Sequence, residues 1–357
     1  MHGRILLATT ALTLSAGFAA ADVAVSGSAR MGIVSTDGVS TFSSNVHASF
    51  SGSGTTDGGL AFGGSFDMHN ASGADGGTSG STFISGAFGK IAMGGVNSGD
   101  KAVVGNLASV GYEGLGSGNS ISYAADGGAL GLEDDNEASA KVLYTYSNNG
   151  LTLAASSAQL TDGGATAYGV GVSYTTGGLT FALGSGQADF TFTDLPIAWV
   201  AGNNDGVENL DGTGSITDTS ASVTYAMGDT TIMAIYQDKS ADIVDDGNGV
   251  HAALDTSVTA TSMGLSVVHK IDAVTLTAYS VTTELDAGDL TADKPTVSRY
   301  GIGAAYNLGG GATLAAGWAA VDAATYNAAD ASGASVVDAT YTTETTNMFD
   351  VGVNFSF

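Results

Sequence analysis

The residues whose chemistry stands out first are acidic and lie in one segment, residues 97–140. Against the single Lys101, this segment carries seven carboxylates: Asp100, Glu113, Asp126, Glu133, Asp134, Asp135 and Glu137. Carboxylates that line a narrow space with low-dielectric walls favour cations, because the walls focus their field. Clustered carboxylates can also hold Ca²⁺, and Glu133 and Asp134 are the candidate ligands, although no EF-hand spacing is present. A solvated surface loop is the alternative interpretation of these charges.

The elements around this segment show an alternation of apolar and polar residues with a period of two, which is typical of β-strands. In the first run, residues 23–33, the apolar side chains share one face and Arg30 lies on the other. Sixteen such runs cover residues 23–33, 42–50, 60–69, 81–88, 90–96, 141–147, 151–159, 167–175, 179–187, 220–227, 230–237, 257–268, 274–283, 296–308, 312–320 and 345–357. The sequence therefore predicts an all-β protein of about 16 antiparallel strands.

The connections between these runs alternate in length. Short turns such as 148–150 and 176–178 alternate with long connections such as 188–219 and 238–256. A transmembrane antiparallel up-and-down β-barrel has this arrangement, with short periplasmic turns at one rim and long loops at the other. A soluble β-sandwich is the alternative, but it would leave sheet edges to protect. The last run favours the barrel, since its apolar face continues to the final residue, Phe357.

The charges indicate which face of each strand meets lipid. An Arg or Lys that faces lipid near the midplane costs about 2 to 4 kcal/mol, and the apolar faces of the clearest strands carry no charged residue. Four basic or polar residues fall on the polar faces instead: Arg30, His47, His69 and Arg299. We therefore expect these four side chains to belong to the wall of a water-filled lumen.

The segment 97–140 is too long for an ordinary connection. Loops of more than about 12 to 15 residues are uncommon in compact chains and are usually functional. We expect this one to fold into the barrel and to form its constriction, with Glu113, Asp126, Glu133, Asp134, Asp135 and Glu137 as the acidic residues of the pore.

Residues 1–21 have the features of a secretory signal peptide, so the barrel should comprise residues 22–357. A basic start with Arg4 precedes an apolar stretch and three alanines at 19–21. The formal charge of -26 becomes -27 when Arg4 is removed, which excludes general nucleic-acid binding. The chain has no cysteine, so it uses neither disulfides nor cysteine-based metal sites.

Several segments resemble the general diffusion porins of alphaproteobacterial outer membranes, the Rhodobacter type. They are DVAVSGSARMGIV at 22–34, TFISGAFGKIAMG at 82–94, LYTYS at 143–147, YGIGAAYNLGGGAT at 300–313 and the closing VGVNFSF. The resemblance implies a homotrimer in the Gram-negative outer membrane, surrounded by lipid and lipopolysaccharide, that lets small hydrophilic solutes diffuse passively. It also implies a third loop folded into the pore, calcium near that loop, and recognition of Phe357 by the barrel assembly machinery.

This sequence departs from the resemblance in one respect. The family places a cluster of Arg and Lys opposite the acidic loop, whereas here only Arg30 and Arg299 are candidates, beside Asn45 and His47. We therefore expect a pore that prefers cations.

Three other functions remain open from the sequence. A substrate-specific outer-membrane channel would have a related wall. A barrel hydrolase would need a Ser, His and Asp arrangement, for which His47, His69, His251 and His269 are the available histidines. A calcium-dependent adhesin would fit the content of Gly and Asp, but no nonapeptide repeat is present. We expect a channel and no enzyme.

Overall fold

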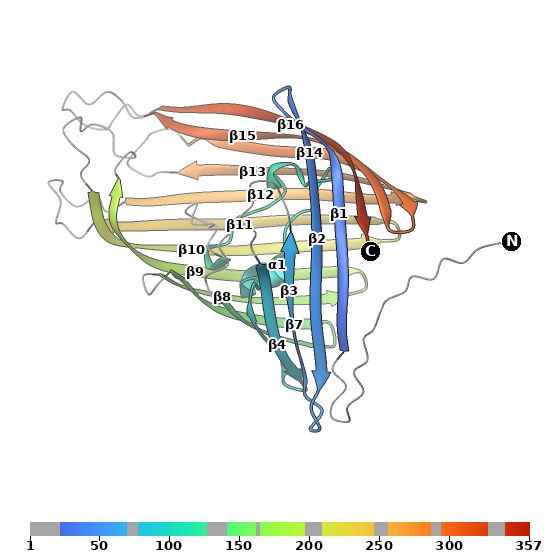
Figure 1. Cartoon of the computed structure of the whole chain (residues 1–357). Helices are drawn as coiled ribbons and strands as arrows, with labels where there is room; N and C mark the ends of the chain where they lie inside the picture. The colour runs from blue at the N-terminus through green and yellow to red at the C-terminus, as the bar shows by residue number, and fades with distance from the viewer. Residues whose placement is uncertain are drawn as a thin grey trace.

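A computed structural model of the chain describes residues 22–69, 78–126, 141–161, 165–196, 209–245, 256–286, 294–327 and 340–357. In this part of the chain, sixteen antiparallel strands close into one barrel, as the alternation predicts (Figure 1). The strands are β1 Asp22–Thr36, β2 Val39–Thr55, β3 Ala61–His69, β4 Thr78–Gly86, β5 Gly89–Gly94, β6 Lys141–Asn148, β7 Leu151–Thr161, β8 Ala165–Thr176, β9 Leu179–Pro196, β10 Asn209–Met227, β11 Thr230–Asp245, β12 Thr256–Ile271, β13 Val274–Asp286, β14 Thr296–Gly309, β15 Ala312–Asn327 and β16 Thr340–Ser356. The predicted signal peptide lies outside the described residues.

The barrel closes where its first strand, β1, pairs with its last strand, β16. The sheet formed by the described residues therefore has no unpaired edge strand. β1 pairs with β16 from Ser28 opposite Ser356 to Thr36 opposite Met348. Gly27 and Phe357 then exchange two backbone hydrogen bonds of 2.7 and 2.9 Å. An open sheet edge cannot be solvated inside hydrocarbon, and full closure removes it.

Large apolar side chains stay exposed on the outer face of the barrel. Val25, Leu183 and Ile302 are 61%, 59% and 59% exposed, each on the face that the sequence pattern assigns to lipid. Tyr300 and Trp318 pack edge to face on the same surface, with ring centroids 5.5 Å apart. A surface this apolar favours contact with lipid over contact with water.

Several strands are longer than the alternation indicates. The predicted connections 188–219 and 238–256 contain the last residues of β9, the first of β10 and the last of β11. Beyond the membrane both faces of a strand meet water, so the backbone ladder continues there without apolar alternation. The rule of alternation therefore locates the membrane-spanning part of a strand and misses its polar extension.

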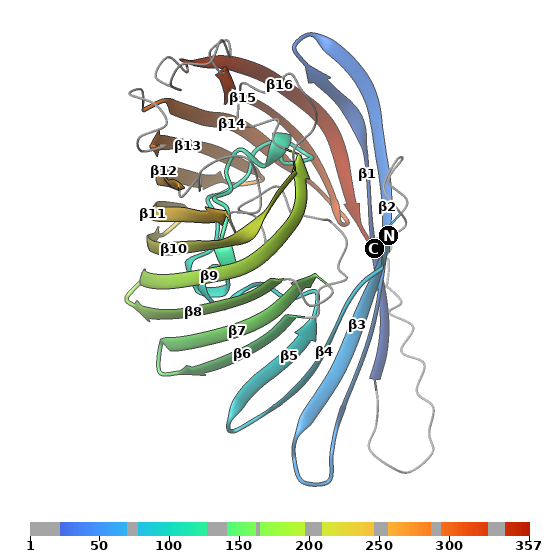
Figure 2. The same ribbon diagram turned by 90° about the vertical axis from the view of Figure 1, so that its left-hand side faces the viewer.

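The height of the barrel wall varies around its circumference. β9 and β10 contain 18 and 19 residues, whereas β3, β4 and β5 contain 9, 9 and 6. Figure 2 shows β3, β4 and β5 side by side, with β9 and β10 farther along the wall. The barrel wall is therefore low at β3, β4 and β5, which we call the low sector.

Candidate pore constriction

The segment between β5 and β6 lies inside the ring of strands (Figure 2). Its described part forms the helix α1 Gly99–Val104 and the 3-10 helices η1 Leu115–Ser117 and η2 Ala124–Asp126. Helix α1 and η2 pack mainly on the inner faces of β7–β10, and η1 packs on β15 and β16. Within the described residues, no helix is long and apolar enough to span a membrane.

An apolar cluster fastens this loop to the wall. Its loop members are Val104, Leu107, Val110, Leu115, Ile121 and Tyr123, and its wall members are Ala182, Ile235, Tyr279, Val281 and Ala319. The wall residues project into the barrel, where the sequence pattern predicts polar side chains. That prediction is wrong at these positions, because the loop and not water covers them. We call the inner faces of β7–β16 the covered wall.

Glycines let the loop backbone approach the covered wall closely. A Cβ atom on Gly317 of β15 would lie 2.6 Å from the Cα atom of Gly111, which itself has a φ of +79°. A Cβ atom on Gly184 of β9 would lie 2.8 Å from the Cβ atom of Asp100 in α1. Both distances are too short for a real side chain, so the fit of the loop depends on these glycines.

Two buried carboxylates of the wall hold loop backbone groups that would otherwise lack partners. Asp350 of β16 accepts hydrogen bonds from the N–H groups of Tyr112 and Glu113, at 2.9 and 3.0 Å. Asp218 of β10 accepts one from the N–H group of Ala124 at 2.7 Å. Neither aspartate is distinguishable in sequence from other polar residues of the lumen face, and the sequence analysis missed both.

Asp126, a predicted acidic pore residue, is paired inside the loop. Its carboxylate forms ion pairs with Lys101 and with Lys141 of β6, the second at 2.9 Å, and it accepts the N–H of Ser98 at 3.1 Å. Burial raises the pKa of Asp126, but the hydrogen bonds and charges of the two lysines outweigh it and lower that pKa below its ordinary value. Asp126 is therefore largely neutralised by its partners.

Among the described residues, Asp100, unlike Asp126, has no basic side chain beside it to balance the cost of its burial. Its side chain is fully buried at the start of α1, and its carboxylate oxygens have no hydrogen-bond partner of good geometry. Burial raises the pKa of Asp100 above its ordinary value.

Glu113, the second predicted acidic residue in the described part of the loop, faces β1 and β2. Its carboxylate lies 3.5 Å from Nε of Arg30 and accepts a hydrogen bond from Ser43. The structure thus brings a predicted loop carboxylate and a predicted wall base together. The other predicted acidic residues, Glu133, Asp134, Asp135 and Glu137, lie outside the described residues.

Three further wall bases approach the loop. Nη1 of Arg299 on β14 donates to the carbonyl oxygen of Ser120 at 2.9 Å. Lys239 of β11 contacts Oγ of Ser122, and Lys141 pairs with Asp126 as described above. The sequence analysis did not identify Lys141 or Lys239 as wall residues, although each follows the alternation of its strand.

The low sector of the barrel has a different inner surface, which we call the bare wall and define as the inner faces of β3–β5. Ser65 and Lys90 are exposed there, and the ammonium of Lys90 lies 4.5 Å from the centroid of the Phe83 ring. Ser65 and Lys90 thus keep polar groups exposed on this part of the inner surface.

The histidines show no catalytic arrangement in the described residues. Nε2 of His47 lies 3.8 Å from Asp67, but Ser49 donates its hydroxyl hydrogen to Asp67 and not to His47. A histidine must accept the serine proton to activate it, so these three residues do not form a triad. The backbone of His69 pairs with that of His47, and the His69 side chain lies outside the described structure. Nδ1 of His269 is hydrogen-bonded to Thr230 at 2.9 Å.

No group of three or more His, Cys, Asp or Glu that could hold a metal ion occurs in the described part of the chain. The predicted calcium ligands Glu133 and Asp134 lie outside that part. Calcium binding therefore stays a prediction.

Comparison with known proteins finds the same barrel fold in solved structures and identifies the protein family of the chain. Residues 8–326 match the profile of a Gram-negative porin family. A porin of Rhodobacter capsulatus is 34% identical over 305 residues, which cover 82% of this chain and 92% of the relative. A porin structure refined at 1.8 Å resolution is 29% identical, covers 94% of this chain and 100% of its own, and has a TM-score of 0.68.

A more distant structure agrees in fold alone. OmpT, an outer membrane protein of Vibrio cholerae solved in a trimer form, is 19% identical with a TM-score of 0.71, and the match covers 94% of this chain and 99% of that one. The closed sixteen-stranded barrel, the loop inside it and the match over most of the sequence lead to one conclusion: the chain belongs to the Gram-negative porin family, and it is an outer-membrane diffusion channel.

Proposed function

We propose that the pore prefers cations and passes small hydrophilic solutes without an enzymatic step. The observation that carries this proposal is the engagement of the wall bases. Lys141, Lys239 and Arg299 each contact the loop or one of its carboxylates, and Arg30 is paired with Glu113, so the charges of these four bases are partly neutralised, while Lys90 of the bare wall stays exposed. The mature chain meanwhile keeps a formal charge of about -27, which supports a negative potential in the lumen.

Reversal potentials in planar bilayers under a KCl gradient test this selectivity. We expect the sign of a potassium-preferring channel, weakened at high ionic strength because salt screens exposed charges. Glu113→Gln should move the reversal potential toward zero, whereas Lys270→Gln, which changes an exposed base at the short-turn rim, should leave the sign unchanged. A reversal potential with the sign of chloride preference would contradict the proposal.

We propose further that the channel is a homotrimer whose subunits meet at the low sector. A strand of six residues, such as β5, rises about 20 Å and spans roughly 15 Å of membrane when tilted by about 40°. The apolar band of an outer-membrane barrel is about 25 Å tall. Phe66, Ile84 and Met93 are nonetheless 45%, 38% and 48% exposed on the outer face of β3–β5, so a second copy is a better neighbour than lipid.

Electrophoresis without heating tests the trimer. The unheated protein should migrate as a trimer and the heated protein as a monomer. Met93→Lys should shift unheated protein toward the monomer, and Met93→Leu, the apolar control, should not. Monomeric migration of the unheated wild-type protein would contradict the proposal.

We also propose that calcium binds near the constriction and that the barrel assembly machinery recognises Phe357. Both proposals rest on the resemblance to Rhodobacter porins and, for calcium, on Glu133 and Asp134. Calcium should protect the wild-type protein against thermal unfolding, and a Glu133→Gln, Asp134→Asn double variant should lose this protection. Equal protection of the two proteins would remove these residues from the site.

A further inference from the structure

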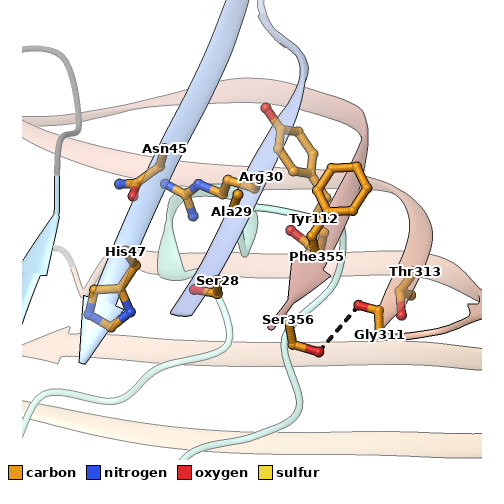
Figure 3. Close-up of a pocket in the computed structure, with 11 residues that line it drawn as sticks. Ser28, Ala29, Arg30, Asn45, His47, Tyr112, Gly311, Thr313, Phe355 and Ser356 are labelled. Atoms are coloured by element: carbon orange, nitrogen blue, oxygen red, sulfur yellow. Dashed lines mark hydrogen bonds between the residues drawn. The ribbon is translucent and has the colours of Figure 1, made fainter. Parts of the chain in front are cut away.

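A recess opens on the inner face of β1, β2, β15 and β16 beside the loop, and its lining combines polar side chains with the apolar residues Ala29 and Phe355 (Figure 3). Its volume is about 580 Å³, within the range of small-molecule sites. The recess lies at the short-turn end of the barrel, since its lining includes Gly311 and Ser356. Tyr112 of the loop also lines it, so the recess lies directly beside the loop that folds into the barrel.

The strand register arranges the lining side chains in two rows. In the first row Thr313, Asn354, Arg30 and Asn45 are successive partners across β15, β16, β1 and β2. In the second row Ser356, Ser28 and His47 are partners across β16, β1 and β2. Neighbouring strands lie about 4.8 Å apart, and residues two positions apart on one strand face the same side. The recess is therefore a regular grid of hydrogen-bonding groups with one guanidinium near its centre.

The side chains of this grid are basic or neutral, whereas the protein as a whole is strongly acidic. The chain has 35 acidic and nine basic residues, yet among the described residues no carboxylate lines the recess, while Arg30 and His47 do, the latter with Asp67 3.8 Å from its Nε2. Nε of Arg30 faces Glu113 at 3.5 Å, which is longer than a hydrogen bond. Within the described residues, neither terminal amino group of this guanidinium has a hydrogen-bond partner.

The free end of a guanidinium fits a carboxylate, which it binds through two parallel N–H bonds. Asn354 and Asn45 flank Arg30 and can each donate and accept, and the hydroxyls of Ser28 and Thr313 can do the same. Groups of this kind match a ligand that carries several hydroxyls next to its carboxylate.

We propose that the recess is a binding subsite for small hydroxylated monocarboxylates, the sugar-acid class of solute. The proposal rests on the channel function but adds to it a saturable step beside the constriction. A net negative potential in the lumen disfavours organic anions, and a local basic site offsets that penalty for anions that fit. Glu113 competes with the ligand for Arg30, so binding should be weak, with a Kd on the order of 1 mM.

Block of the KCl conductance in planar bilayers tests the subsite. The probes are gluconate, a monoanion with five hydroxyls, and sorbitol, a neutral polyol of the same length. Gluconate should lower the conductance saturably, and sorbitol should lower it only in proportion to its concentration. Arg30→Gln should weaken the gluconate block about tenfold, as expected for a lost charge-assisted pair. Glu113→Gln should strengthen the block severalfold, because the competing carboxylate is removed.

Lys270→Gln is the matched control, since it removes one positive charge at an exposed position outside the recess. It should leave the gluconate block unchanged. Equal block by gluconate and sorbitol, or an undiminished gluconate block in Arg30→Gln, would overturn the subsite while leaving the channel intact. A wild-type protein that does not conduct KCl at all would contradict the channel function instead.

Discussion

The covered wall and the bare wall are built from the same alternating strands, but they use their inner positions differently. The covered wall turns apolar residues such as Ile235 and Val281 toward the loop and places glycines where the loop backbone touches. The bare wall keeps exposed residues such as Ser65 and Lys90 in its inner positions. The comparison shows that the ten strands β7–β16 act as a socket for the constriction, whereas the three strands β3–β5 keep polar side chains exposed on their inner face.

The largest effect that distinguishes the two walls should come from placing the same charge on each. Ile235 is buried under the loop, where its strand partners are Ser222 and Gly264, so Ile235→Asp buries a carboxylate without a partner and should destabilise the folded loop by more than about 3 kcal/mol. Ser65 is exposed on the bare wall, and Ser65→Asp should change thermal stability little. Thermal unfolding in detergent measures both. Similar losses of stability in the two variants would remove the distinction between the walls.

A smaller effect is expected from the carboxylate that holds the middle of the loop. Asp350→Ala removes the acceptor for the N–H groups of Tyr112 and Glu113, at a cost of about 2 kcal/mol. The loop should then fluctuate more, so single-channel recordings should show more open-channel noise. Asn354→Ala, four residues further along β16, should keep the noise of the wild-type channel. Equal noise in all three proteins would show that Asp350 does not restrain the loop.

The smallest expected effect is a pH dependence of opposite sign at the loop aspartates Asp100 and Asp126. The pKa of Asp100 is raised by burial, so its charged form destabilises the loop above that pKa, and this cost decreases as the pH falls below the raised pKa and is gone below the ordinary value of 3.8. Asp100→Asn should therefore be more stable than wild type at high pH and equal to it at low pH. The pKa of Asp126 is lowered, so its contribution is present above the ordinary aspartate value of 3.8 and is lost as the pH falls through the lowered pKa.

Asp126→Asn should accordingly be less stable than wild type at neutral pH, with a difference that shrinks only in strong acid. Thermal unfolding across a pH series records both variants under the same conditions. A stability difference that does not change with pH in either variant would mean that neither carboxylate titrates as its surroundings indicate.

The sequence predicts the barrel well because lipid imposes a strict rule on it. Every strand that crosses the membrane must present an apolar face outward, so alternation locates all sixteen strands and places Arg30 and Arg299 on the inner face. Outside the membrane a strand needs no apolar face, so alternation does not mark it there. The polar extensions of β9, β10 and β11 were missed for that reason.

The constriction is harder to predict, because its contacts join residues that are far apart in the chain. Glu113 and Arg30 were assigned to opposite sides of the pore, and the structure places them together. Asp218 and Asp350 carry no local signal of their role as acceptors for the loop. One usable signal exists: Ile235, Tyr279 and Val281 interrupt the polar faces of their strands, which indicates that something other than water covers them.

The most direct test of the account is the accessibility of the two walls to a reagent in the pore. The chain has no cysteine, so single cysteines can be introduced without interference. Ser65→Cys lies on the bare wall, whereas Ser222→Cys lies under the loop, where Ser222 is 6% exposed and donates to the carbonyl oxygen of Val104 at 3.0 Å. A positively charged methanethiosulfonate should lower the conductance of the Ser65 variant and leave the Ser222 variant unchanged. Modification of the Ser222 variant at the same rate as the Ser65 variant would contradict the placement of the loop and the passage that it leaves open.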